Sequence, residues 1–267
     1  MLLDTHCHLT DARYRGELSG VLERAAGAGV SGVIAIASDL RDAERVRALL
    51  TESAAPGGGG ARIWGTAGVH PHEAAKAPAD FRERLREALA HPEVVAVGEC
   101  GLDFHYDFSP RDSQRRVFDE HIEVASELDL PLVVHCREAE EEMTERVLEA
   151  GKAGVRGVLH CFPGDPGLLT AALDAGWLVS FTGLVTFKSF DGVEAVRNVP
   201  ADRYMLETDG PYMAPVPYRG KRNEPAFLPL IRDRMAELRG EAPEKVECDT
   251  SETACRFFRL PHANEGA

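Results

Sequence analysis

Short aliphatic runs alternate with longer amphipathic stretches along this chain, and this alternation constrains its fold most. The runs with strand-like composition are 1–6, 33–37, 63–69, 94–99, 132–135, 155–160, 178–181 and 204–207. Between them apolar residues recur at helical spacing, most clearly over 112–130. Strands that alternate with helices pair in parallel, so eight repeats predict an α/β fold, a (β/α)8 TIM barrel. A doubly wound open sheet is the alternative fold.

The length of 267 residues fits one barrel domain, which we expect to span 1–260 with a short tail at 261–267. Two additional C-terminal helices are predicted near 224–239 and 243–259. The glycine-rich stretch 56–61 is interpreted as a surface loop, because the strand–helix pattern resumes unchanged after it. No apolar run is long enough for a membrane span and no secretory signal begins the chain, so we expect a cytoplasmic protein without a membrane partner, and a monomer is favoured.

Histidines and carboxylates stand at or just past the ends of several predicted strands. In a barrel the carboxyl ends of all strands meet at one mouth, where active sites are built. Because side chains alternate along a strand, His6 and His8 project to the same side and Cys7 to the other. The convergence of ligand-type residues on five strands predicts a metal site. The polar residues at strand ends are His6, His8, His70, His72, Glu99, Asp103, His135, His160, Glu207 and Asp209.

The chain has six cysteines, and four of them are immediate sequence neighbours of proposed ligands. Strand alternation predicts that these thiols point away from the ligands, into the layer between strands and helices. A zinc site that uses both cysteine and histidine is the competing interpretation. The four cysteines are Cys7, Cys100, Cys136 and Cys161.

The number and type of the proposed ligands indicate more than one metal ion. Imidazole nitrogens combined with carboxylate oxygens suit Zn²⁺, Mn²⁺, Fe²⁺ or Ni²⁺. Four histidines and two carboxylates exceed what one catalytic metal binds, because such a metal keeps a coordination position open. Two metals about 3.5–4 Å apart that share a carboxylate fit better, and such pairs serve hydrolytic displacements.

The chain resembles the TatD family of metal-dependent deoxyribonucleases, within the wider group of amidohydrolase-like barrels. The resemblance runs in the family's order from residue 4 to residue 225, and the set of motifs is specific although "HxH" alone is weak. The matching segments are "DTHCHL", "GVHPHEA", "AVGECGLDF", "SPRDSQRRVFDEHIEVASELDLPLVVHCREA", "GVLHCF", "GWLVSFTGLVTFK", "LETDGPY" and "RGKRNEP".

The resemblance implies a site of two divalent ions, Mg²⁺, Mn²⁺ or Zn²⁺, with Glu99 bridging them. It implies that Asp209 orients or deprotonates the attacking water. The implied activity is hydrolysis of phosphodiesters in DNA, by a 3′–5′ exonuclease on single strands with a role in DNA repair. The implied ligands are His6, His8, Glu99 and Asp209 for one metal, and Glu99, His135 and His160 for the other.

The net charge of −14 argues against a nucleic-acid partner, whose binders usually carry a basic patch. Two divalent ions would partly offset this charge where a phosphate must lie. Basic residues on loops at the mouth are candidates for contacts to neighbouring phosphates. The predicted substrate-binding residues are His70, Arg137, Lys188 and Arg222, with Arg219 and Lys221 beside them; Tyr212, Phe162 and Phe187 are candidates for base stacking, although packing is favoured for these three.

Other functions remain open from the sequence. Another amidohydrolase-type enzyme acting on a small molecule is one, although many of these use a lysine where this chain has Glu99. A D-aminoacyl-tRNA deacylase and a non-catalytic metal-binding protein are two more. Gly210 replaces the family's usual alanine or serine and is expected to loosen the loop after Asp209. Asp4 is either a partner that fixes a histidine tautomer or a buried acid bonded to backbone.

Overall fold

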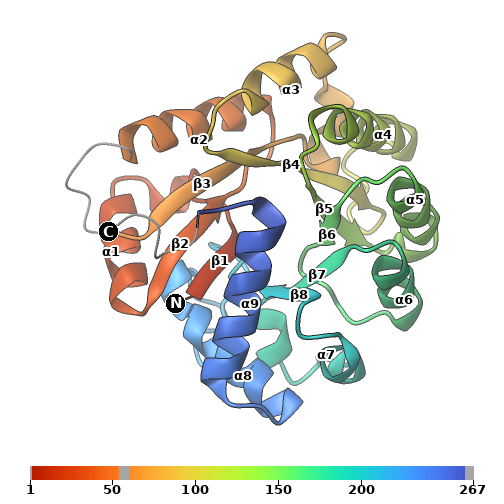
Figure 1. Cartoon of the computed structure of the whole chain (residues 1–267). Helices are drawn as coiled ribbons and strands as arrows, with labels where there is room; N and C mark the ends of the chain where they lie inside the picture. The colour runs from red at the N-terminus through yellow and green to blue at the C-terminus, as the bar shows by residue number, and fades with distance from the viewer. Residues whose placement is uncertain (1, 54–59, 262–267) are drawn as a thin grey trace.

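The computed structural model describes residues 2–53 and 60–261, which form the predicted (β/α)8 barrel. Eight parallel strands pair in sequence order, and a bridge between Cys7 and Gly210 joins the first strand to the segment after the last (Figure 1). The strands are β1 (Leu2–Cys7), β2 (Val30–Ala35), β3 (Arg62–Ala67), β4 (Val94–Asp103), β5 (Leu132–Arg137), β6 (Gly157–Leu159), β7 (Leu178–Phe181) and β8 (Tyr204–Leu206).

Helices connect successive strands and form the outer layer of the barrel. The helices in the described chain are α1 (Leu18–Gly27), α2 (Leu40–Ser53), α3 (Phe81–Leu89), α4 (Arg111–Leu128), α5 (Glu140–Lys152), α6 (Pro166–Asp174), α7 (Val193–Asn198), α8 (Leu228–Arg239) and α9 (Pro243–Phe258). Short 3₁₀ turns are η1 (Ala12–Tyr14), η2 (Pro71–Lys76), η3 (Gly183–Thr186) and η4 (Pro225–Phe227). The two C-terminal helices lie where the sequence predicts them.

Local sequence signals explain where several helices begin and end. Asp165 caps α6 by accepting a hydrogen bond from the backbone N–H of Leu168 at 2.7 Å, and Pro166 occupies the first helical position. Helix α8 ends at Gly240, whose φ of 66° is the left-handed conformation that glycine adopts without strain. Asp165 thus marks the start of α6, and Gly240 marks the point where the chain leaves α8 toward α9.

Three strand ends differ from the prediction in a way that affects the site. Strand β4 continues past the predicted end at Glu99 to Asp103. Strands β6 and β8 stop before His160 and Glu207, which therefore lie in the following turns. The predicted loop 56–61 and tail 261–267 fall largely on residues 54–59 and 262–267, which lie outside the described residues, so the domain limits stay a prediction.

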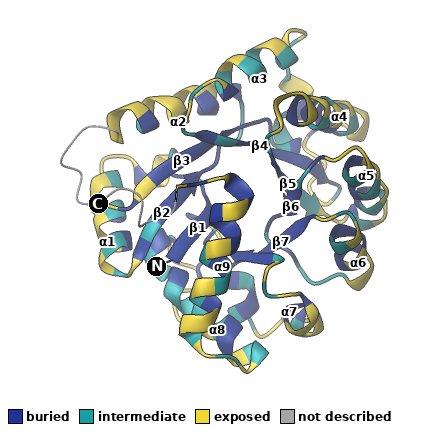
Figure 2. Ribbon diagram, viewed as in Figure 1, coloured by how far each residue is buried: buried dark blue, intermediate teal, exposed yellow. Residues whose placement is uncertain are grey.

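Two apolar clusters hold the barrel together. One fills the layer between the strands and the outer helices, where Val33 and Ala35 of β2 lie with Val46 and Leu50 of α2. The strands are buried, while the outer helices expose their far faces (Figure 2). Within the described residues no helix has the length and apolarity needed to cross a membrane.

The second cluster occupies the barrel interior, and α9 closes it from the end where the strands begin. Leu3 of β1 and Leu178 of β7 lie in this cluster together with Phe257 and Phe258 of α9. Helix α9 is seen across the ring of strands in Figure 1. Because apolar side chains fill this end, polar groups are accessible only from the opposite end of the barrel.

Candidate metal centre

Four of the predicted ligands meet at the carboxyl ends of β1, β4 and β8. His6 Nε2 and His8 Nε2 are 3.4 Å apart. Each lies 3.5 to 3.7 Å from Glu99 Oε2 and from Asp209 Oδ1. Separations of this size are those expected between ligands of one ion, and His6, His8 and Glu99 form one of the candidate metal groups of the described chain. Asp209 adjoins this group through both histidines.

A second set of atoms surrounds the other oxygen of Glu99. His160 Nε2 lies 2.8 Å from Glu99 Oε1, and His135 Nδ1 lies 3.2 Å from the same oxygen. The two imidazole nitrogens are 3.3 Å apart. His70 Nε2 is also 3.5 Å from Glu99 Oε1, which brings this predicted substrate-binding residue among the potential ligands. The two oxygens of Glu99 thus face two different groups of nitrogen atoms.

The residues present fit a bound cation by their donor chemistry and by their burial. The Glu99 side chain is 2% exposed, and its Oε2 atom has no hydrogen-bond partner within the described chain. A buried carboxylate oxygen without a partner is costly, and a metal ion would satisfy it. Histidine nitrogens and carboxylate oxygens are the mixed set that first-row divalent metals accept.

Glycines let the strand that carries Glu99 approach its neighbour. Gly101 has a φ of 128°, and a Cβ atom there would run into the carbonyl oxygen of His135. Gly98 has a φ of 136°, and a Cβ there would meet the backbone of Val133. The glycines on either side of Glu99 are therefore required for β4 to lie against β5, which brings Glu99 to His135.

The mutual proximity of these groups shifts their pKa values. Burial acts to raise the pKa of Glu99, but His160, His70 and His6 outweigh it and hold the pKa well below its usual range. Burial acts to lower the pKa of His160, but Glu99 and Glu207 raise it well above its usual value. Burial likewise opposes ionisation of Asp209, yet His8 and His6 lower its pKa. The carboxylates of the site are ionised at neutral pH.

Asp103 and His72, two residues named at strand ends but absent from the predicted ligand set, support the second group. Asp103 Oδ2 accepts hydrogen bonds from His135 Nε2 at 2.9 Å and from His72 Nε2 at 3.0 Å. A carboxylate only accepts, so His135 Nε2 carries a proton toward Asp103, and Nδ1 is the nitrogen that would bind an ion beside Glu99. Asp103 follows Glu99 by four positions along β4, and this same-face spacing is the sequence signal that identifies it.

Glu207 and Asp4 hold the backbone around the ligands. Glu207 accepts hydrogen bonds from Ser180 Oγ and from the backbone N–H of Cys161, both at 2.7 Å. Asp4 accepts from the backbone N–H of Thr208 at 2.9 Å and from its hydroxyl at 2.5 Å. Burial raises the pKa of Asp4 to about 7. Asp4 therefore anchors the segment that carries Asp209 and fixes no histidine tautomer.

The cysteines beside the ligands follow the predicted alternation with one difference. Cys7 and Cys100 are buried in the cluster between strands and helices, and Cys136 packs against it. Cys161 lies past the end of β6 with a φ of 47°, so strand alternation does not apply there, and its Sγ contacts Thr182 Oγ1 at 3.2 Å. No cysteine belongs to the candidate metal groups found among the described residues.

The predicted basic contacts occupy different surroundings. Arg137 at the end of β5 lies over the ring of Tyr106, 4.6 Å from its centroid. Lys188 is exposed on the segment between η3 and α7. Arg222 donates to Glu17 and to the carbonyl of Arg13, both at 2.8 Å, so its guanidinium already has partners on η1 and the segment after it.

The predicted stacking residues also separate. Phe162 is buried in the outer cluster, and Phe187 lies beneath Arg219, which is 4.4 Å from its centroid. Tyr212 is 48% exposed at the mouth. The packing role that the sequence favours for all three residues therefore fits Phe162 best, because only Phe162 of the three belongs to the buried cluster.

The expectation that Gly210 loosens the loop after Asp209 is wrong. Gly210 accepts a hydrogen bond from the backbone N–H of His8 at 2.7 Å, and a Cβ atom added there would lie 2.5 Å from Tyr14 Oη. The Tyr14 hydroxyl donates to the carbonyl of Asn223 at 2.6 Å. Tyr14 therefore fills the space that a larger residue would take, and the loop is held in place.

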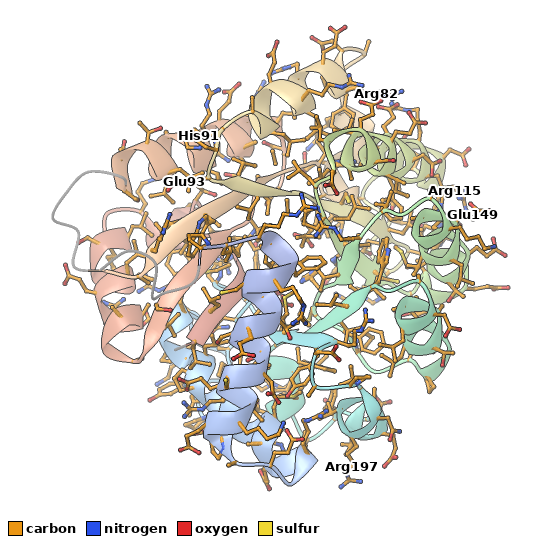
Figure 3. The ribbon with its side chains drawn as sticks, in the orientation of Figure 1. Arg82, His91, Glu93, Arg115, Glu149 and Arg197 are labelled. Atoms are coloured by element: carbon orange, nitrogen blue, oxygen red, sulfur yellow. The ribbon has the colours of Figure 1, made fainter. Side chains whose placement is uncertain are left out.

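A cleft of about 980 Å³ lies away from these ligands, between α4 and α5. Figure 3 shows two of its lining residues, Arg115 and Glu149, on the outer helices. Arg115 is paired with Glu142 at 2.8 Å, and Arg146 is paired with Asp119. Because its arginines are neutralised, the cleft offers an anion no free cationic partner among these residues.

Comparisons with known proteins show the family to which the chain belongs. A family model described as TatD related DNase matches residues 3–259. The uncharacterized metal-dependent hydrolase YabD of Bacillus subtilis (strain 168) is 36% identical over 261 residues, which cover 97% of this chain and 100% of that protein. A protein of Pantoea vagans named 3′-5′ ssDNA/RNA exonuclease TatD is 36% identical over 266 residues, which cover 97% and 100%.

A solved structure shows the same fold. The crystal structure of YjjV, a TatD homolog from Escherichia coli K12, superposes with a TM-score of 0.89 at 27% identity and covers 97% of this chain and 98% of that one. Together with the family model and the relatives, this shows that the chain belongs to the TatD related DNase family of metal-dependent hydrolases acting on ester bonds.

Proposed function

We propose that this protein is a 3′–5′ exonuclease that hydrolyses phosphodiester bonds of single-stranded nucleic acid with two divalent ions. His6, His8, Glu99 and Asp209 would hold one ion, and Glu99, His135 and His160 the other. A relative that covers nearly the whole chain is named a 3′-5′ ssDNA/RNA exonuclease, which supports the choice of substrate. Cleavage assays with Mg²⁺, Mn²⁺ or Zn²⁺ added would identify the metals.

The observation that carries the proposal is the position of Glu99 between two groups of ligand atoms. Its Oε2 faces His6 and His8, while its Oε1 faces His135 and His160. A carboxylate shared in this way is what a two-metal hydrolytic site needs. All these atoms lie at the open end of the barrel, where a polymer end can enter.

The ions, Asp209 and His70 have separate roles in the proposed reaction. When bound, the two ions activate water and offset the charge of the phosphodiester. Asp209 is ionised and partly accessible, so it can orient the attacking water and accept its proton. His70 borders Glu99, and because its Nδ1 accepts a hydrogen bond from the backbone N–H of His72, its Nε2 carries the proton and can donate it to a substrate oxygen.

The test is cleavage of a single-stranded DNA labelled at its 5′ end, with Mg²⁺, Mn²⁺ or Zn²⁺ added to the purified protein. Stepwise shortening from the 3′ end is expected, and EDTA should stop it. Asp209→Asn is expected to lower the rate at least 100-fold, which is the scale of a lost general base. Asp174→Asn, an exposed aspartate at the end of α6, is the matched control.

Two results would overturn the proposal. Undiminished cleavage by Asp209→Asn would remove Asp209 from the reaction. Rapid deacylation of D-aminoacyl-tRNA in the same metal series, without shortening of DNA or RNA, would replace the proposed substrate.

A further inference from the structure

Exposed large apolar side chains gather on two loops at the mouth of the barrel. The described chain exposes six such residues, and all but Leu128 lie after β4 or after β8. Exposed apolar groups concentrated in this way mark a contact surface. The five residues on the two loops are Tyr106, Phe108, Tyr212, Val216 and Tyr218.

The loop after β4 carries a stacked aromatic pair next to the second group of ligands. The rings of Tyr106 and Phe108 are 5.2 Å apart with an interplanar angle of 20°. Both rings form T-shaped contacts with the His72 ring, with centroids 5.4 and 4.8 Å apart. Arg137 lies over the Tyr106 ring, and Phe108, 68% exposed, is the most exposed large apolar residue described. His72 bonds to Asp103, which in turn bonds to His135.

The loop after β8 carries a second stack next to the first group of ligands. The guanidinium carbon of Arg13 lies 4.1 Å above the centre of the Tyr212 ring. Asp11 fixes this guanidinium with two hydrogen bonds of 2.9 Å. The Tyr212 ring also contacts His8, with centroids 5.8 Å apart. An aromatic ring with a guanidinium plane on it is therefore held beside the first pair of histidines.

The two stacks stand on opposite sides of the ligands. Strands pair in sequence order around the barrel, so β4 and β8 are four positions apart in a ring of eight. One stack touches His72 and the other touches His8, and Glu99 lies between these two sides. A molecule that crosses the mouth over Glu99 from the β4 side to the β8 side passes both stacks.

We propose that the Tyr106–Phe108 pair and the Tyr212–Arg13 pair are two base-stacking platforms, each of which binds one unpaired nucleobase next to the cleaved phosphodiester. Exposed aromatic faces beside cationic guanidinium groups suit a single-stranded nucleic acid, because every base has a π face and every link an anion. A paired base is already stacked within a duplex and cannot enter. This inference rests on the proposed nuclease function and adds that the last two bases at the 3′ end of the strand are each bound by one platform.

The experiment measures binding and cleavage separately on the metal-loaded protein. A fluorescent single strand with phosphorothioate links at its 3′ end is titrated, and strands with an abasic residue at the last or the penultimate position are compared with it. In the wild type each abasic residue should weaken binding about 5- to 150-fold, the value of one base–aromatic stack. Phe108→Ala should abolish this penalty at one of the two positions and Tyr212→Leu at the other. Leu128→Ala, an exposed apolar residue outside both loops, should keep both penalties.

The outcomes separate this inference from the function on which it rests. If the loaded wild type shortens an unmodified strand yet binds abasic strands as tightly as intact ones, the stacking platforms are refuted and the nuclease remains. If both aromatic variants keep both penalties, the assignment to these residues is refuted. If the wild type neither binds nor shortens the unmodified strand, the nuclease function itself is refuted.

Discussion

Replacement of Asp103 by asparagine is expected to weaken the metal group built on His135 while leaving the group built on His8 intact. The carboxylate accepts backbone hydrogen bonds from His105 and Tyr106 through Oδ1, and imidazole hydrogen bonds from His72 and His135 through Oδ2. Two backbone donors keep an oxygen at the Oδ1 position. The amide nitrogen of the variant must therefore lie where Oδ2 lies now and must donate to the imidazoles.

This reversal changes which nitrogen of His135 carries the proton. In the wild type Nε2–H donates to Asp103, and Nδ1 faces Glu99 Oε1 at 3.2 Å. In the variant Nε2 becomes the acceptor and Nδ1 is protonated, so its lone pair is unavailable to a metal. Lost outer partners of metal ligands typically cost about 10- to 100-fold in affinity, or roughly 1.4 to 2.7 kcal/mol, and the tautomer change favours the upper end.

The assay is a metal titration by calorimetry with two sites resolved. Asp103→Asn should lose affinity in one site only, while Asp112→Asn, a highly exposed carboxylate on α4, should change neither. A thermal unfolding curve without metal checks that the variant is folded. Equal loss at both sites, or affinity at both sites within twofold of the wild type, would refute the tautomer argument.

Four further predictions follow from the structure. Burial lowers the pKa of His121 to about 4, whereas the unfolded chain binds this proton below about pH 6.5, so the contribution of His121 to stability falls by about 2 kcal/mol between pH 7 and pH 5. Chemical denaturation at the two pH values should show that the free energy of unfolding of the wild type, relative to that of His121→Gln, decreases by this amount on acidification, because other groups such as Asp4 titrate alike in both proteins. Gly210→Ala should destabilise by about 1–3 kcal/mol because its Cβ meets Tyr14 Oη, and the penalty should shrink when Tyr14→Phe is also present; additive costs in a double-mutant cycle would contradict this. Removal of metal should lower the unfolding temperature, since an ion at 100 times its Kd adds about 2.7 kcal/mol, and a Tm that is independent of added metal would speak against the site. Arg222→Ala should leave the KM for single-stranded DNA within about twofold, because its guanidinium is paired with Glu17; a large rise in KM would restore it as a substrate contact.

The order of strands and the convergence of ligands were predictable from the sequence because both depend on local periodicity. Alternation within β1 places His6 and His8 on one face, and parallel pairing brings the ends of β4, β5 and β8 to the same mouth. These rules need no knowledge of how side chains pack. They also place Cys7 behind the strand, as the structure confirms.

The parts that sequence reasoning missed depend on packing between distant segments. The role of Asp103 follows from a strand that continues past Glu99, and the continuation needs glycines whose close contact with β5 no local pattern reveals. The expected looseness at Gly210 failed for the same reason, because Tyr14 approaches from η1. Asp4 bonds to Thr208 across the barrel seam, a contact between residues 204 positions apart.

The position of α9 bears on how the chain is made. Leu3 of β1 is covered by Phe257 and Phe258 of α9, a helix that the ribosome synthesises after all eight strands. The emerging chain therefore carries an uncovered apolar interior until α9 has been made. We expect ribosome-bound chains that end before residue 243 to recruit chaperones and to resist proteolysis only after α9 has emerged.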